Sequence, residues 1–266
     1  MAAEINEPII RKLLDVIDAG LTSGIGTPEP GQMCVEAAVC YAFSEPHGDK
    51  PTCVSPFLWR LKISINDANW SSDQSRAKGL RRLAIAQLGT AGTLDEAKFR
   101  DRIVRYALGV SAPLALRAAA SIQKDQRHQS SLRDCADWCE REVTREAALA
   151  AIAAADAAAA AAADAAAYAA AYAAYAANAA IAADADAADA ADAAAAAAAD
   201  AADAAAAAAK AADAAAKAAA AKAADAAAAA ADAKRDECLS TYCEDIVKIL
   251  IEMETPGSKW LWLTEV

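Results

Sequence analysis

Apolar residues recur every three or four positions along much of the chain, which is the period of a helix that buries one face. The first such stripe runs from Ile9 to Ile17, with Asn6 as a predicted N-cap and Gly20 at its end. A mostly apolar stretch from about Gln32 to Phe43 predicts the central helix of a folded head. No stretch shows a convincing strand alternation, so the pattern predicts an all-α protein.

Helix-start signals predict further helices along the first half of the chain. They combine a short polar N-cap residue with Pro at the first helical position or with an acidic residue in the first turn. These signals lie at Ser55-Pro56, Ser71-Ser72-Asp73, Thr93-Leu-Asp-Glu96, Ser111-Ala-Pro113 and Ser130 or Ser131. The head is therefore expected to be a small multi-helix domain.

An alanine-rich segment follows the head. Of the 83 residues from Ala151 to Ala233, 63 are alanine, the residue that loses least on entering a helix. On a helical wheel most of the other residues, mainly Asp, fall within a polar stripe roughly 80° wide, and the sector directly opposite it contains only alanine. Such a face packs closely on another helix but buries little area, so we expect this helix to need a partner helix.

The partner helix is either in another copy or in the same chain folded back. Asp residues cluster in Asp184-Ala-Asp186-Ala-Ala-Asp189-Ala-Ala-Asp192, and Asp favours turns over helix interiors. This cluster favours an antiparallel helical hairpin that turns near residues 184–192. The polar stripe keeps nearly the same phase on both sides of the cluster, which favours one very long helix. Both arrangements stay open.

The patterns divide the chain into three parts. Residues 1–130 form the predicted helical head, and residues 131–234 form the long alanine-rich helical arm. Residues 235–266 contain a C-terminal amphipathic cap helix, which runs through Leu239, Ile246 and Leu250, and a tail with Trp260 and Trp262. A segment this apolar must dock on a surface, and we expect it to dock on the head.

The charge and composition of the chain exclude some classes of binding partner. The chain of 266 residues has a net charge of −11, and residues 151–233 carry −8 of it. An acidic arm disfavours nucleic acid and anionic membranes, and basic side chains near Arg81 and Arg102 are interpreted mainly as solvated helix faces. Alanine is only weakly apolar and Asp recurs along the arm, so no membrane span is predicted. Seven cysteines and an N-terminus without a basic and apolar leader predict reduced thiols in a cytoplasm.

One constellation in the head has the residue types of nucleophilic catalysis. Cys34 follows Pro30-Gly-Gln32-Met at a predicted helix start, where the helix dipole lowers the pKa of a thiol. His47 and Asp49 lie in the loop after that helix and would supply a base and the group that orients it. Because one helix separates the two loops, they are expected at opposite ends unless the chain folds back. The alternative interpretation makes Cys34 a small core residue and places His47 in a turn.

The same residues do not have the spacing of a metal site. Cys34, Cys40, His47 and Cys53 are separated by six, seven and six positions, unlike the paired cysteines of zinc motifs. Cys135 with Cys139 and Cys238 with Cys243 form two further pairs that would meet only if the cap returns to the base of the arm. We therefore expect neither a bound metal nor a cofactor.

Two resemblances add to this picture. The head sequences Gly31-Gln-Met-Cys-Val-Glu-Ala-Ala-Val-Cys-Tyr-Ala and Ala77-Lys-Gly-Leu-Arg-Arg-Leu-Ala-Ile-Ala-Gln-Leu-Gly are similar to those of bacterial hypothetical proteins that also carry an Ala/Tyr/Asp-rich tract. This resemblance implies a bacterial cytoplasmic or phage-related origin and no activity. The arm looks like the alanine-rich helical antifreeze proteins, but it contains none of the regularly spaced threonines of that family.

The sequence thus favours a non-enzymatic structural or interaction protein whose alanine-packed arm mediates self-association or binds a protein partner. A homo-oligomer is the expected form. The alternatives are a cysteine-centred hydrolase or transferase, built on Cys34 with His47, and an ice-binding alanine-rich helix.

Overall fold

A computed structural model describes residues 5–161 and 221–265 of the chain. Within these ranges the regular structure is helical, and the β-type pairing is limited to an isolated antiparallel bridge between Gly26 and Met33. The protein is therefore all-α. The proposed turn near residues 184–192, and with it the choice between one long helix and a hairpin, lies outside the described residues.

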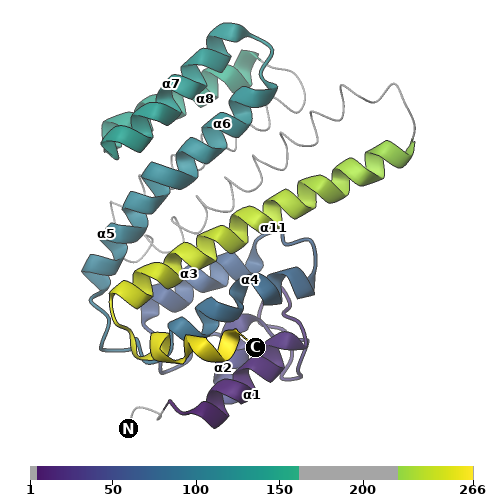
Figure 1. The fold of residues 1–266 in the computed structure, drawn as a ribbon, viewed down its shortest axis with the longest axis vertical. Helices are drawn as coiled ribbons and strands as arrows, with labels where there is room; N and C mark the ends of the chain where they lie inside the picture. The colour runs from purple at the N-terminus through teal and green to yellow at the C-terminus, as the bar shows by residue number, and fades with distance from the viewer. Residues whose placement is uncertain (1–4, 162–220, 266) are drawn as a thin grey trace. The chain divides into compact units, whose positions relative to one another are not determined.

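The chain divides into two compact units, residues 1–100 with 239–266, and residues 101–238. The predicted head ended at residue 130, but residues 101–130 pack with the second unit. Two helices, α5 and α11, cross the division in sequence (Figure 1).

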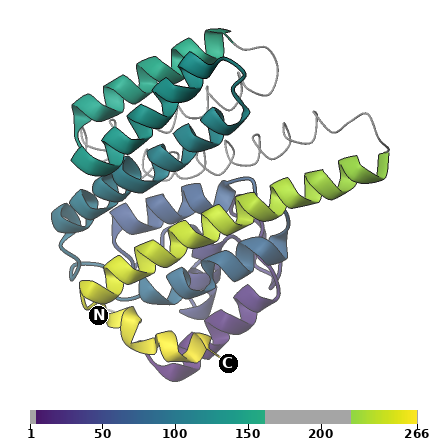
Figure 2. The same ribbon diagram turned by 45° about the horizontal axis from the view of Figure 1, so that its top comes forward.

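The first unit is a cluster of short helices around α2 (Figures 1 and 2). Its elements are α1 (Glu7–Asp18), α2 (Val35–Ala42), α3 (Pro56–Asp67), α4 (Asp73–Ala86), the start of α5 (Glu96–Tyr106), the end of α11 (Ala221–Glu252) and the 3₁₀-helix η2 (Pro256–Thr264). Helix α2 packs against α1, α3 and α4 and is buried on nearly every side, with Val35, Ala38 and Val39 fully enclosed. Because the side chains of α2 are mostly small and apolar, neighbouring helices can pack on it from several directions.

Several helix starts of this unit have the predicted caps. Asn6 accepts a hydrogen bond from the backbone N–H of Ile9, and Ser72 does the same for Ser75. Ser55 precedes Pro56 as predicted, but its hydroxyl donates to Glu96 instead of capping its own helix. At the start of α5, Asp95 is the residue that accepts from the backbone N–H of Lys98. The N-cap is therefore Asp95, two residues after the predicted Thr93, and the predicted capping box does not form.

The C-terminal tail packs on the end of α4 in this unit. The backbone N–H of Gly257 donates to the carbonyl of Leu88 at 2.9 Å, and the Thr255 hydroxyl donates to the carbonyl of Ala86 at 2.9 Å. A Cβ atom on Gly257 would lie 2.1 Å from the carbonyl oxygen of Ile85. Only glycine permits this backbone-to-backbone approach, so position 257 fixes where the tail lies.

The second unit contains three helices that pack side by side, α6 (Ala112–Ile122), α7 (Gln126–Glu142) and α8 (Arg145–Ala161) (Figures 1 and 2). Their shared core is formed mainly by alanine together with a few larger residues, Leu116, Leu132 and Cys139. Helix α8 lies entirely within the predicted arm, and its alanines at 147, 151, 155 and 158 are fully buried.

Pro113 does not start a new helix, contrary to the sequence prediction. Helices α5 and α6 are joined by one turn of π-helix, Ala107–Ser111, and the backbone N–H of Ala112 donates five residues back to Ala107. Proline has no N–H, and its ring displaces the carbonyl four residues earlier, so a wider turn accommodates it inside a helix. The resulting helical stretch, Glu96–Ile122, is the described segment that is long and apolar enough to cross a membrane, and 56% of its apolar window is buried in the protein. Buried core helices pass the same test.

The arm also does not begin as one uninterrupted helix at residue 131. Helix α7 starts earlier, with Asp125 as N-cap, and it ends at Glu142. Val143 then adopts a left-handed conformation, with φ 49°, and α8 starts at Arg145 and packs back on α7. No glycine or proline marks this break. A β-branched residue in this conformation is strained, and the packing of α7 on α8 compensates for the strain.

Candidate functional site

Cys34, the predicted nucleophile, is the N-cap of α2 and is 4% exposed. Its Sγ accepts a hydrogen bond from the backbone N–H of Ala37 at 3.3 Å. Burial raises the pKa of the thiol to about 11, since desolvation of the thiolate outweighs the hydrogen bonds at the helix start. The expectation that the helix dipole lowers this pKa is therefore wrong, and Cys34 carries its proton at neutral pH.

His47, the predicted base, is exposed in the loop after α2, and its Nε2 donates to the backbone carbonyl of Gly26 at 3.1 Å. The chain does fold back here, because Gly26 belongs to the loop that leads into Cys34. Within the described residues, however, His47 forms no hydrogen bond or ion pair with Cys34 or Asp49. The predicted arrangement of base and orienting carboxylate is absent from this part of the structure.

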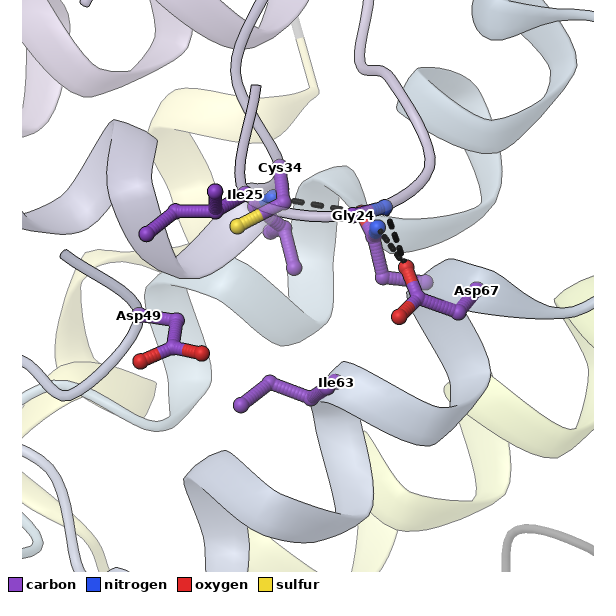
Figure 3. Close-up of a pocket in the computed structure, with 8 residues that line it drawn as sticks. Gly24, Ile25, Cys34, Asp49, Ile63 and Asp67 are labelled. Carbon is purple, nitrogen blue, oxygen red and sulfur yellow. Dashed lines mark hydrogen bonds between the residues drawn. The ribbon is translucent and has the colours of Figure 1, made fainter. Parts of the chain in front are cut away.

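Asp49, the predicted orienting group, lies beside a cavity of about 330 Å³ (Figure 3). The cavity is lined by Gly24, Ile25, Cys34, Val35, Asp49, Ile63, Asn66 and Asp67. The structure thus brings Cys34 and Asp49 to one pocket and leaves His47 outside its lining. The segments that meet there are the loop before α2, the start of α2, the loop after it and the end of α3.

Asn66 and Asp67 organise one side of this cavity. Asn66 is 1% exposed, accepts from the backbone N–H of Val35 at 3.2 Å and donates to the carbonyl of Thr22 and to Asp67 at 2.9 Å each. Asp67 Oδ1 also accepts from the backbone N–H of Gly24 at 2.7 Å. These bonds hold the loop against the end of α3. The sequence pattern did not single out either residue. Their only sequence signal is that they are two adjacent polar residues at the end of a mostly apolar helix.

A buried ion pair lies in the core near this pocket. Lys62 Nζ is 3.2 Å from Glu36 Oε1, both side chains are fully enclosed, and Gln87 Nε2 donates to the other Glu36 oxygen at 3.1 Å. The ammonium is not aligned for a hydrogen bond to this carboxylate. Neither Lys62 Nζ nor Glu36 Oε1 therefore has a hydrogen-bond partner among the described residues. Burial raises the pKa of Glu36 to about 7 and lowers the pKa of Lys62, because desolvation outweighs their mutual attraction.

The sequence pattern did not predict the ion pair of Glu36 and Lys62 either. A single Glu inside an apolar helix, Val35-Glu36-Ala37-Ala38-Val39, is the signal that was present. A charge at such a position must be paired or neutralised in the folded protein. Lys62 gave no comparable signal, because lysine is common on exposed helix faces.

Most of the cysteine thiols are buried, and arginines of α4 form bonds within the protein. All seven cysteines are free, and burial raises the pKa values of Cys40 and Cys53 to about 12. Across residues 5–161 and 221–265, no three His, Cys, Asp or Glu side chains are grouped to hold a metal ion. Arg76 donates to the carbonyls of Asn66 and Leu21. Much of the basic character around α4 therefore serves internal bonds.

We compared the chain with protein families, curated proteins and solved structures. No family model matches it, and no curated protein or solved structure shows significant similarity to it. Functional inference therefore depends on the residues themselves.

Proposed function

We propose that this chain is a non-enzymatic structural or interaction protein, and that its alanine-rich helical segment packs against another helix, in a second copy or in a protein partner. The supporting observation is the packing of α8. Ala147, Ala151, Ala155 and Ala158 recur every three or four positions and are fully buried in the core shared by α6, α7 and α8. A methyl side chain lets helix backbones approach closely, so a face of this composition is suited to helix–helix packing.

The sequence pattern of α8 continues beyond its described end. Plotted on a helical wheel, the sequence of residues 162–220 has an alanine-only sector opposite the polar stripe that starts at Asp156. This face has the same composition as the face that α8 buries. Because an alanine face buries little area per residue, a long segment is needed to gain a useful total, and the length of this one fits association better than a local packing role.

Catalysis by a cysteine receives no comparable support. A nucleophilic cysteine requires the thiolate, and the thiol of Cys34 has a pKa of about 11. A protonated, buried thiol that accepts a hydrogen bond from Ala37 is suited to capping a helix. The interaction function is therefore the better proposal.

The test compares two pairs of substitutions in the full chain. On a helical wheel Ala198 and Ala205 lie opposite the polar stripe, whereas Ala196 and Ala207 lie within it. Glutamine is a good helix former and adds bulk without charge. Ala198→Gln with Ala205→Gln should weaken association, and Ala196→Gln with Ala207→Gln should leave it unchanged.

Sedimentation velocity and native mass spectrometry over a concentration series measure the association. A chain that is monomeric at every concentration, and whose melting temperature falls only in the Ala198/Ala205 variant, would place the alanine face in an internal contact. That result would overturn self-association. If both pairs of substitutions acted equally, the alanine face would have no specific role.

A further inference from the structure

The cavity of the first unit has negatively charged side chains in its lining. Two of its lining residues, Asp49 and Asp67, are carboxylates, and none is Lys, Arg or His. Asp49 is half-buried and, among the described residues, has no hydrogen-bond or ion-pair partner. The adjacent Lys50 lies over the Trp59 ring, 5.5 Å from its centroid. A partly desolvated carboxylate without a partner favours a cation.

The start of α2 does not offer the cavity an anion site. Helix N-termini attract anions through backbone N–H groups that lack a partner. Here the N–H of Val35 donates to Asn66, and the N–H of Ala37 donates to Cys34. The end of α3, where Asp67 lies, contributes the negative end of a helix dipole. The local field therefore favours positive charge.

The two carboxylates lie on opposite sides of the cavity, with Ile63 between them in the view of Figure 3. Asp67 is fixed in position, because its Oδ1 accepts from the backbone N–H of Gly24 at 2.7 Å and from the side-chain amide of Asn66 at 2.9 Å. The Ser23 hydroxyl reaches the same oxygen at 3.5 Å. A carboxylate held by neighbouring bonds loses little freedom when it binds a ligand.

The walls between the carboxylates are apolar. Ile25 is 44% exposed, Ile63 is half-buried and Val35 is fully buried. Such walls suit methylene groups, and the cavity volume of about 330 Å³ is within the range of small-molecule sites. A metal ion fits less well, since no three potential ligands are grouped in the described residues.

We propose that this cavity binds a small aliphatic diamine, with one ammonium at Asp49, the other at Asp67, and the methylene chain against Ile25 and Ile63. The site lies in the first unit and does not depend on the alanine-rich arm. It adds a small-molecule ligand to a protein whose proposed function is helix association.

The test is isothermal titration of the full chain with 1,4-diaminobutane and 1,5-diaminopentane. Butylamine and 1,4-butanediol serve as ligands with one charge and with none. At least one diamine should bind more tightly than butylamine, and the diol should not bind. Binding of butylamine as tight as that of both diamines would overturn the two-ended site.

Variants separate the pocket from the overall negative charge. Asp49→Asn and Asp67→Asn each remove one charge with little change of shape, and each should weaken diamine binding about tenfold or more, as expected for a lost charge-assisted hydrogen bond. Asp15→Asn removes a charge from an exposed position of α1 and should leave binding unchanged. Equal weakening by Asp15→Asn and Asp49→Asn, or no binding of either diamine at millimolar concentration, would refute the proposal.

Discussion

The buried pair of Glu36 and Lys62 gives the sharpest prediction about stability. Both side chains are fully enclosed, their charged atoms are 3.2 Å apart, and Gln87 supplies a hydrogen bond to Glu36 only. The perturbation is Glu36→Gln, which keeps the shape and the amide contact but leaves the ammonium of Lys62 without a counter-charge. Lys62→Met in the same chain then removes that ammonium with nearly conserved volume.

The magnitudes follow from desolvation. Removing one partner of a buried ion pair costs about 3–5 kcal/mol, because the remaining charge has lost both water and its counter-ion. Replacing both charges by neutral groups of similar volume is often neutral or stabilising. We therefore expect Glu36→Gln to lower the unfolding free energy by about 3–5 kcal/mol and the double variant to recover most of that loss.

The assay is urea unfolding at pH 7, followed by tryptophan fluorescence in a Trp138→Phe background. Trp138 is the tryptophan of the second unit, and the other four lie in the first, so fluorescence then reports on the unit that contains the pair. Separate probes matter because two compact units do not unfold as one two-state system. The free energy is taken from the midpoint and slope of the transition.

An exposed ion pair supplies the control. Asp18→Asn breaks the contact of Asp18 with Arg81, in which the Asp18 side chain is 51% exposed, and it should cost no more than about 1 kcal/mol. A cost for Glu36→Gln as small as that of Asp18→Asn would refute the reasoning. So would a double variant no more stable than Glu36→Gln, since the isolated ammonium would then not be the source of the loss.

Further predictions concern packing, backbone strain and thiol reactivity. Gly79→Ala would place a methyl group 2.2 Å from the Trp70 ring, so thermal unfolding should show a loss of about 1–3 kcal/mol; an unchanged melting temperature would contradict the packing. Val143→Gly should change stability by less than about 1 kcal/mol, because relief of the left-handed strain offsets the lost packing of Val143 on Ala107, Leu108 and Ala148, and a large fall in melting temperature would count against that explanation. Alkylation at pH 8 followed by peptide mapping should find Cys34 modified later than the half-exposed thiols, and its modification first would show that its pKa is not raised.

The comparison of sequence and structure is clearest at the helix ends. Asn6 and Ser72 cap helices as expected, because an N-cap acts on backbone groups two or three residues away. Pro113 and Val143 behave against expectation. Pro113 lies inside a helix directly after a π-turn, and Val143 ends a helix although it is not glycine. In both cases packing with neighbouring helices overrides the local preference of the residue.

In the candidate site, too, the sequence predicted some features correctly and others not. The sequence drew attention to Cys34 and Asp49, which do line one cavity, but it also assigned Cys34 a lowered pKa. That assignment used the helix dipole, which is a local property. Burial by residues distant in sequence has the larger effect and raises the pKa instead. No sequence motif predicts that Asn66 and Asp67 line the cavity.

The sequence by itself determined the helical class, the starts of α1, α3 and α4 and the composition of the alanine face, because these depend on periodicity and on contacts within one turn. Only the tertiary structure decided that Lys62 meets Glu36 and that two carboxylates share a cavity with apolar walls. These features depend on contacts between distant segments and on how much water those contacts exclude. Neither quantity can be obtained from the order of residues along one helix.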